Sequence, residues 1–184
     1  MIPVGMPNEL DALRDISSRL TDAGIPFMLT GSLAMSFYAI PRMTRDIDLV
    51  VELESIDPER LVKLLEPDYY VSREAIMEAT QYSSLFNVIH RASVVKIDCI
   101  PRKPDEYHVL EFRRRTQVTV DDFTLWVVSR EDLILSKLLW ARDSHSEIQL
   151  ADVRNLLDPS VDTGYVSQWS ERLGISALWE EVSR

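Results

Sequence analysis

The amino-acid sequence predicts an α+β protein in which a small mixed β-sheet is flanked by helices and followed by a helical C-terminal portion. Strand-length runs rich in β-branched and aromatic residues occur up to about residue 128, between segments of helical periodicity. After that point the apolar spacing is helical. With 184 residues, 46% of them hydrophobic, the chain is long enough for one core. We expect a single domain over residues 1–184, with a sheet-bearing part (1–128) and a helical part (129–184).

The N-terminal elements are expected to be a packing helix, a strand and a second helix. Apolar residues recur at helical spacing over residues 9–23, and a strand is predicted at residues 27–29. Gly31 and Ser32 then open a helix over residues 33–39. A helix start offers free N–H groups and positive dipole charge, and a glycine there lets the backbone approach a phosphate closely. By itself, the Gly-Ser pair is more typical of an ordinary turn with an N-cap.

The next predicted strand, residues 46–52, carries two aspartates on one face. Because side chains alternate along a strand, Asp46 and Asp48 point one way and the apolar residues between them point the other. Neighbouring carboxylates repel each other, and a hard divalent cation with oxygen ligands would relieve the repulsion. Taken alone, this pattern fits either a metal site or a solvated strand edge.

A third carboxylate follows in the middle of the chain. Asp98 lies on the expected strand 93–100, on the face opposite to the apolar set. Three carboxylates on neighbouring strands could hold two cations that promote an in-line displacement at phosphorus. The alternative is an ordinary strand-end residue. The elements expected around it are a helix at 58–65, a strand at 69–71, a helix at 73–80, a hairpin at 84–90 and 93–100, and a helix at 107–114.

The last part of the chain adds a second hairpin and the helical portion. Strands at 116–120 and 123–128 are predicted by their β-branched and aromatic content. Ser129 and Asp132 form a capping box for a helix whose apolar run is interrupted by Lys137. That lysine could extend along its own stem to water. Further helices are expected at 148–157, 165–173 and 176–182.

The net charge, the single cysteine and the lack of long apolar runs limit the classes of protein to which the chain can belong. Thirty acidic residues against 20 Lys and Arg give a net charge of −10, so strong general nucleic-acid binding is not expected. The single cysteine, Cys99, cannot form a disulfide within the chain and is expected in the core. No apolar run approaches the length of a membrane span, and the N-terminus lacks signal-peptide features. We expect a soluble cytoplasmic protein.

Two stretches of the sequence combine into one pattern. Leu-Thr-Gly-Ser-Leu-Ala occupies residues 29–34, and Pro-Arg-Met-Thr-Arg-Asp-Ile-Asp-Leu occupies residues 41–49, with 13 residues between Ser32 and Asp46. This arrangement resembles the DNA polymerase β-like nucleotidyltransferase superfamily. Within that superfamily it is most similar to the AbiEii-like abortive-infection toxins and their bacterial relatives. The later string Glu-Asp-Leu-Ile-Leu-Ser-Lys, ending at Lys137, resembles the third motif of the same toxins.

The resemblance implies a nucleotidyltransferase fold that transfers a nucleoside monophosphate from an NTP to an acceptor and releases pyrophosphate. It implies Mg²⁺ or Mn²⁺ held by Asp46, Asp48 and Asp98, which would also be the catalytic residues. An aspartate of a fourth motif is matched by either Asp143 or Asp152, of which we choose Asp152. The residues that the resemblance assigns to the nucleotide are Gly31, Ser32, Arg42, Thr44, Arg45, Lys137 and Asp152.

The acceptor and the partners stay open at this point. RNA or tRNA, a protein hydroxyl and a small molecule are all compatible with the resemblance, and a toxin would imply a cognate antitoxin. The alternative from another class is a catalytically silent module that keeps the fold and binds a nucleotide or a partner. The three clustered carboxylates argue against that alternative, because a structural role gives no reason to place them together.

Overall fold

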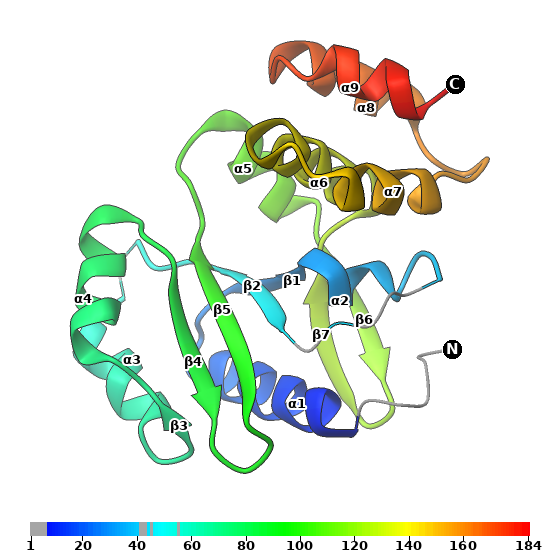
Figure 1. Cartoon of the computed structure of the whole chain (residues 1–184). Coiled ribbons are helices and arrows are strands. Elements are labelled where there is room, and N and C mark those ends of the chain that lie inside the picture. Colours follow the sequence, from blue (N-terminus) through cyan, green and yellow to red (C-terminus); the bar gives the residue numbers. More distant parts are fainter. Residues whose placement is uncertain (1–6, 41–43, 45, 55) are drawn as a thin grey trace.

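The computed structural model describes residues 7–40, 44, 46–54 and 56–184 (Figure 1). Arg42 and Arg45, two of the expected nucleotide contacts, lie outside the described residues. The helices are α1 (Pro7–Asp22), α2 (Gly31–Met35), α3 (Pro58–Leu65), α4 (Arg73–Tyr82), α5 (Glu106–Arg113), α6 (Arg130–Ser144), α7 (Glu147–Leu156), α8 (Thr163–Arg172) and α9 (Ser176–Val182). The strands are β1 (Phe27–Thr30), β2 (Ile47–Val51), β3 (Tyr69–Tyr70), β4 (Phe86–His90), β5 (Val95–Pro101), β6 (Thr116–Val120) and β7 (Phe123–Val127).

The strands of the described chain form one mixed sheet, in the order β3-β4-β5-β2-β1-β7-β6. β2 runs parallel to β5 and β1 parallel to β7, whereas the other neighbouring strands are antiparallel. The predicted α+β class with a mixed sheet and a helical C-terminal portion is confirmed. The register places Asp48 opposite Thr30 of β1 on one side and opposite Asp98 of β5 on the other.

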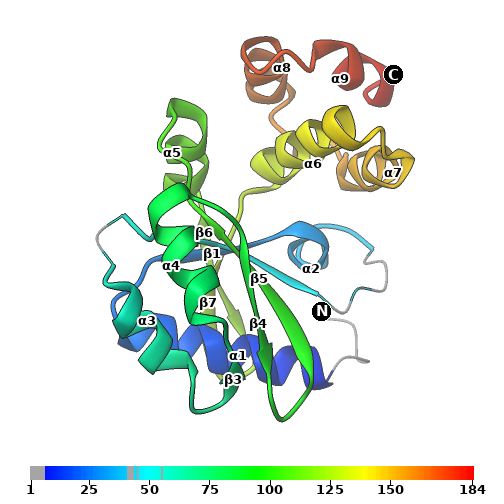
Figure 2. The same ribbon diagram turned by 60° about the vertical axis from the view of Figure 1, so that its left-hand side comes forward.

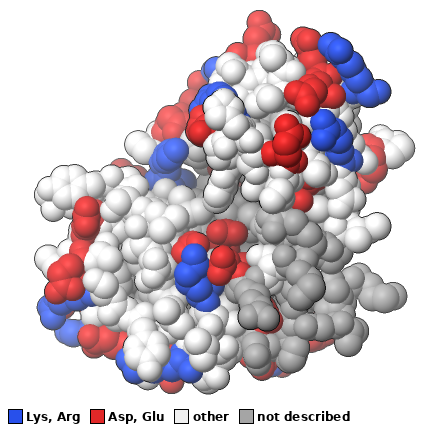
Figure 3. Space-filling view, in the orientation of Figure 1, with Lys and Arg blue, Asp and Glu red and all other residues white. Residues whose placement is uncertain are grey.

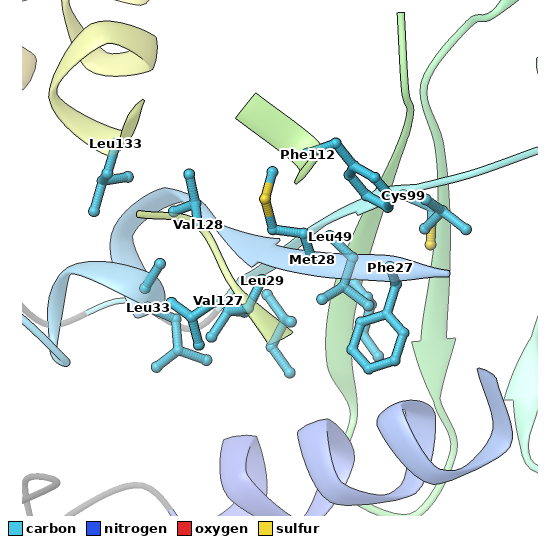
Figure 4. Close-up of a cluster of buried hydrophobic side chains, with 14 of the residues drawn as sticks. Phe27, Met28, Leu29, Leu33, Leu49, Cys99, Phe112, Val127, Val128 and Leu133 are labelled. Atoms are coloured by element: carbon cyan, nitrogen blue, oxygen red, sulfur yellow. The ribbon is translucent and has the colours of Figure 1, made fainter. Parts of the chain in front are cut away.

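Alternating burial in β2 and β5 separates an apolar face from a polar one. The odd-numbered residues of both strands, such as Leu49 and Cys99, are buried, and the even-numbered residues between them are partly exposed. Cys99 is therefore a core residue, as predicted, and burial raises the pKa of its thiol to about 12. Figure 4 shows the apolar side chains of β1, β2, β5 and β7 gathered in this core, with Phe27 above α1.

Helices cover the sheet on two sides. In both ribbon views, α1 lies below the strands and α6 to α9 lie on the opposite side of the molecule (Figures 1 and 2). All four residues of β1 are buried, as expected for a strand near the centre of a covered sheet. Within the described ranges, no helix combines the length and the apolar character that crossing a bilayer requires.

Several predicted boundaries were wrong by two residues or more, and turns explain two of them. The helix after Gly31 ends at Met35 rather than at residue 39, because the amides of residues 36–38 bond to carbonyls three residues earlier and make tight turns. The Ser36 hydroxyl adds to this change by donating to the Leu33 carbonyl oxygen at 2.6 Å. The turn before β5 also extends through Val94, which has a φ of +55°, so that strand begins at Val95.

The buried side chain of Asp132 joins three helices. Its carboxylate accepts hydrogen bonds from Arg114 Nε after α5 at 2.9 Å, from the Tyr165 hydroxyl of α8 at 2.7 Å and from Ser129 Oγ at 2.5 Å. The Ser129 hydroxyl in turn accepts from the Asp132 amide, which confirms Ser129 as the N-cap of α6. The Arg114 guanidinium also stacks on the Tyr165 ring at 4.0 Å. This carboxylate therefore fixes α5 and α8 against the start of α6.

Replacing Asp132 by Ala should lower the free energy of unfolding by about 2–4 kcal/mol, because one buried and two partly buried donors lose a charged acceptor. Urea denaturation of the purified variant measures this difference. The matched control is Asp143→Ala, whose exposed carboxylate pairs only with its neighbour Arg142 among the described ion pairs. Its expected effect is below about 1 kcal/mol. Equal effects in the two variants would contradict the assigned role of Asp132.

Candidate active site

A pocket of about 470 Å³ opens on the polar face of β2 and β5, under α6. Figure 3 shows acidic and basic side chains side by side near the middle of this face of the molecule. The pocket brings together most of the sequence-predicted site residues that the structure describes. Those that line it are Gly31, Ser32, Thr44, Asp46, Asp48, Asp98 and Lys137.

The three aspartates form a carboxylate cluster on this face. Asp48 and Asp98 are direct neighbours in the parallel pair, where adjacent strands lie about 4.8 Å apart, and Asp46 immediately precedes β2. Burial, followed by repulsion from Asp98 and then Asp46, raises the pKa of Asp48 to about 6. Asp98 Oδ1 is buried, and none of the residues that the structure describes forms a hydrogen bond with it. The cluster thus carries more negative charge than its surroundings neutralise.

Lys96 contacts this cluster, and sequence reasoning did not identify it as a site residue. Its ammonium lies 2.8 Å from Asp98 Oδ2 and 3.8 Å from Asp46 Oδ2. These contacts raise the pKa of the Lys96 ammonium, mainly through the hydrogen bond to Asp98. The sequence pattern could have identified Lys96, because strand alternation places it on the same face as Asp98.

Gly31 is required for the position of Asp48. Its φ is +66°, a left-handed conformation that side chains with a Cβ rarely adopt. A Cβ at this position would stand 2.0 Å from Asp48 Oδ2. The carboxylate therefore packs directly against the glycine backbone at the start of α2. Thr30 occupies the N-cap position, but its side chain makes no capping hydrogen bond.

Lys137 is buried rather than extended to water. Its ammonium donates to Asp152 Oδ2 at 2.6 Å and to Gln149 Oε1 at 3.2 Å, both on α7. The structure therefore brings two predicted nucleotide contacts together as an ion pair between α6 and α7. Of these three residues, Lys137 and Gln149 line the pocket, whereas Asp152 supports the lysine and does not belong to the described lining. Thr44 lies at the rim, and its hydroxyl is 3.5 Å from the Asp46 carbonyl oxygen.

The far wall of the pocket comes from α5 and α6. Glu111 lines it although the residue is only 4% exposed, and Trp140 lines it with 57% of its surface exposed. Burial, and next the charges of Asp132 and Asp105, raise the pKa of the Glu111 carboxyl to about 8. Sequence reasoning missed Glu111 because it lies in a polar, basic stretch, although its spacing of four residues from buried Tyr107 indicates the same helix face.

Residues 17–158 match the family described as "Nucleotidyl transferase AbiEii toxin, Type IV TA system". The chain belongs to this family. It is accordingly an NTP-dependent nucleotidyltransferase, and the resemblance read from the sequence is confirmed. None of the curated proteins compared with the sequence matches it.

Solved structures of nucleotidyltransferases share the fold of this AbiEii-family chain. A nucleotidyltransferase candidate from Thermotoga maritima, TM1012, is 18% identical with a TM-score of 0.57, over 77% of this chain and 90% of that one. The lincosamide antibiotic adenylyltransferase LnuA is 14% identical with a TM-score of 0.51, over 82% and 95%. The antibiotic-resistance factor ANT(2'')-Ia is 15% identical with a TM-score of 0.52, over 94% and 91%. These likenesses show that the chain has the fold of these nucleotidyltransferases.

Nucleotidyltransferases generally use divalent metals, and the carboxylate cluster of this AbiEii-family protein fits such an ion. Its donors are oxygens, the ligands that hard cations prefer, and Asp98 Oδ1 is buried without a hydrogen-bond partner in the described part of the chain. In the described residues, no three His, Cys, Asp or Glu side chains already converge as a preformed metal site. The Lys96 ammonium instead contacts two of the three carboxylates.

Replacing Gly31 by Ala should lower the free energy of unfolding by more than about 2 kcal/mol and displace Asp48, because strain at positive φ adds to the clash with its carboxylate. The matched control is Gly174→Ala, since Gly174 has a φ of +69° and nothing within 4 Å of an added Cβ. Urea denaturation of both variants separates backbone strain from the clash. Equal losses of unfolding free energy in Gly31→Ala and Gly174→Ala would show that the Asp48 side chain moves away from the added methyl group at no cost.

Glu111 should make the protein less stable as the pH rises. The folded-state pKa of about 8 lies above the ordinary value of 4.5, so the folded state binds more protons between these values. The Glu111 contribution to the unfolding free energy should therefore fall by up to about 1.4 kcal/mol per pH unit from pH 5 to 8. Glu111→Gln should flatten the measured pH profile, whereas Glu106→Gln, on the exposed side of the same helix, should leave it unchanged. Parallel profiles for wild type and Glu111→Gln would contradict this assignment.

Proposed function

We propose that this protein is a metal-dependent toxin that transfers a nucleoside monophosphate from an NTP to an acceptor hydroxyl or similar nucleophile. The acceptor atom forms a bond to the α-phosphorus and gives its proton to a carboxylate of the pocket, while the bond from that phosphorus to the pyrophosphate oxygen breaks and pyrophosphate leaves. The observation that carries the proposal is the meeting of Asp46, Asp48 and Asp98 beside Gly31 in one pocket. The type IV toxin–antitoxin family to which the chain belongs supports the toxin role.

The carboxylates of Asp46, Asp48 and Asp98 would hold Mg²⁺ or Mn²⁺. A divalent cation in such a site neutralises phosphate charge and orients the phosphate for in-line displacement. The protein contributes the three oxygen donors at fixed positions on β2 and β5, and the Gly31 backbone that keeps the Asp48 carboxylate in place. Positioning and electrostatic stabilisation account for most of the catalysis in reactions of this kind.

The start of α2 and the buried lysine would bind the triphosphate. Gly31 and Ser32 line the pocket next to the carboxylates, which supports a role for their backbone and for the serine hydroxyl in binding phosphate oxygens. Lys137 brings a positive charge to the opposite wall, and Asp152 holds that ammonium in place at 2.6 Å. Thr44 at the pocket rim, with Arg42 and Arg45 of the same segment, completes the proposed nucleotide contacts.

The acceptor would enter along α5 and α6. Glu111, His108 and Trp140 line the wall of the pocket away from the start of α2, and they combine a buried carboxyl, an imidazole and an exposed aromatic ring. RNA or tRNA, a protein and a small molecule stay open as acceptors. The net charge of −10 disfavours extended contacts along a long nucleic acid. A cognate antitoxin is the expected protein partner, and the cytoplasm is the expected compartment.

Thermal unfolding with each of the four NTPs, with and without Mg²⁺, tests the nucleotide and metal parts of the proposal. A nucleotide at about 100 times its Kd should stabilise the folded protein by about 2.7 kcal/mol. We expect stabilisation that needs Mg²⁺ and disappears in Asp48→Ala. The matched control, Asp11→Ala, changes an exposed aspartate on α1, away from the pocket, and should respond as wild type does.

The results of this experiment separate the alternatives. No stabilisation by any nucleotide would contradict the proposed site. Mg²⁺-dependent binding, followed by no pyrophosphate release in a screen of RNA, protein and small-molecule acceptors, would indicate a catalytically silent nucleotide-binding module.

A further inference from the structure

Lys96 occupies a place in the pocket that the proposed reaction does not explain. It lies in β5 two residues before Asp98, and its ammonium approaches Asp98 Oδ2 at 2.8 Å and Asp46 Oδ2 at 3.8 Å. Both carboxylates belong to the proposed cation site. The lysine therefore joins the two strands across the position where a divalent cation would have its ligands.

The ammonium and a divalent cation would compete for the same oxygen. Mg²⁺ binds carboxylate oxygens at about 2.0–2.1 Å, and Asp98 Oδ2 already accepts a charged hydrogen bond from Lys96. A full positive charge at this distance from the ligand also repels an incoming cation. Cation binding therefore requires Lys96 to move away.

The side chain of Lys96 is able to move. It is 40% exposed, whereas the Asp98 side chain that it contacts is only 16% exposed. A lysine has a flexible four-carbon stem, and its ammonium binds phosphate as a point charge without a fixed geometry. Lys96 lines the same pocket as Gly31, Ser32 and Lys137, so an incoming triphosphate would present oxygens within this pocket.

We propose that Lys96 is a counter-ion that occupies the divalent-cation site in the absence of a nucleotide. When an NTP binds, the Lys96 ammonium forms ion pairs with its phosphates and leaves the carboxylates to the cation. The cation and the nucleotide then bind cooperatively. The phosphates draw the Lys96 ammonium away from the carboxylates, and the cation that takes its position makes the ammonium available to the phosphates. Without a nucleotide, the carboxylates are the anionic groups that the described lining of the pocket offers to the displaced ammonium, so the cation binds weakly. This inference rests on the proposed function, since it assigns a role at the same site.

Calorimetric titration with Mn²⁺ alone tests the first half of the proposal. Lys96→Met should bind Mn²⁺ at least tenfold more tightly than wild type, because the competing charge is gone. Lys96→Arg keeps the charge and should bind Mn²⁺ as weakly as wild type. Lys63→Met, which removes an exposed lysine from α3, is the matched control and should not change the affinity. If Lys96→Met does not fold, as judged by circular dichroism and melting, Lys96→Gln replaces it.

The second half is tested with the non-hydrolysable α,β-methylene analogues of the four NTPs. In wild type, saturating Mn²⁺ should tighten analogue binding at least tenfold, and linkage requires the same factor for Mn²⁺. In Lys96→Met this factor should fall to a few-fold. An unchanged or weaker affinity of Lys96→Met for Mn²⁺, or an unchanged coupling factor, would overturn the role of Lys96 while leaving the proposed function intact. A failure of every variant to bind Mn²⁺ or any analogue would instead overturn the proposed function, and this inference with it.

Discussion

The site depends on the parallel pairing of β2 with β5, which fixes two aspartates side by side. In the register, Asp48 faces Asp98 directly, so each strand delivers a carboxylate to the same face. The opposite face of the same residue pairs is apolar and buried, and a shift by one residue would turn these apolar side chains toward the pocket. Core burial therefore enforces a register in which like charges must lie close together.

The wall opposite the sheet depends on a second constraint, the packing of α5 and α8 against the start of α6. Asp132 accepts hydrogen bonds from Arg114 and Tyr165, which come from segments far apart in the sequence. This arrangement places Glu111 in the pocket wall and adds negative charge near its carboxyl. The helical portion thus shapes both the form and the electrostatics of the pocket, even though the three aspartates come from the sheet.

Sequence reasoning predicted the parts of the structure that depend on local periodicity. Strand alternation placed Asp46, Asp48 and Asp98 on one face, and Cys99 in the core. It did not predict the ion pair between Lys137 and Asp152, because that contact arises from the packing of α6 on α7. The early end of α2 was missed because serine and turn hydrogen bonds competed with helix formers in residues 33–39. Arrangements set by tertiary contacts leave little periodic signal in a single sequence.

The pocket concentrates unfavourable electrostatics that a ligand could relieve. Asp48 and Glu111 both have raised pKa values because they are buried near other carboxylates, and Lys96 neutralises only part of the charge at the aspartate end. Groups of this kind cluster at functional sites, where stability is given up for binding or chemistry. A divalent cation would reduce the repulsion among the aspartates but bring new repulsion toward Lys96. A polyanionic ligand such as a triphosphate would form an ion pair with Lys96. The cation and the triphosphate together therefore balance the charges of the pocket better than either does alone.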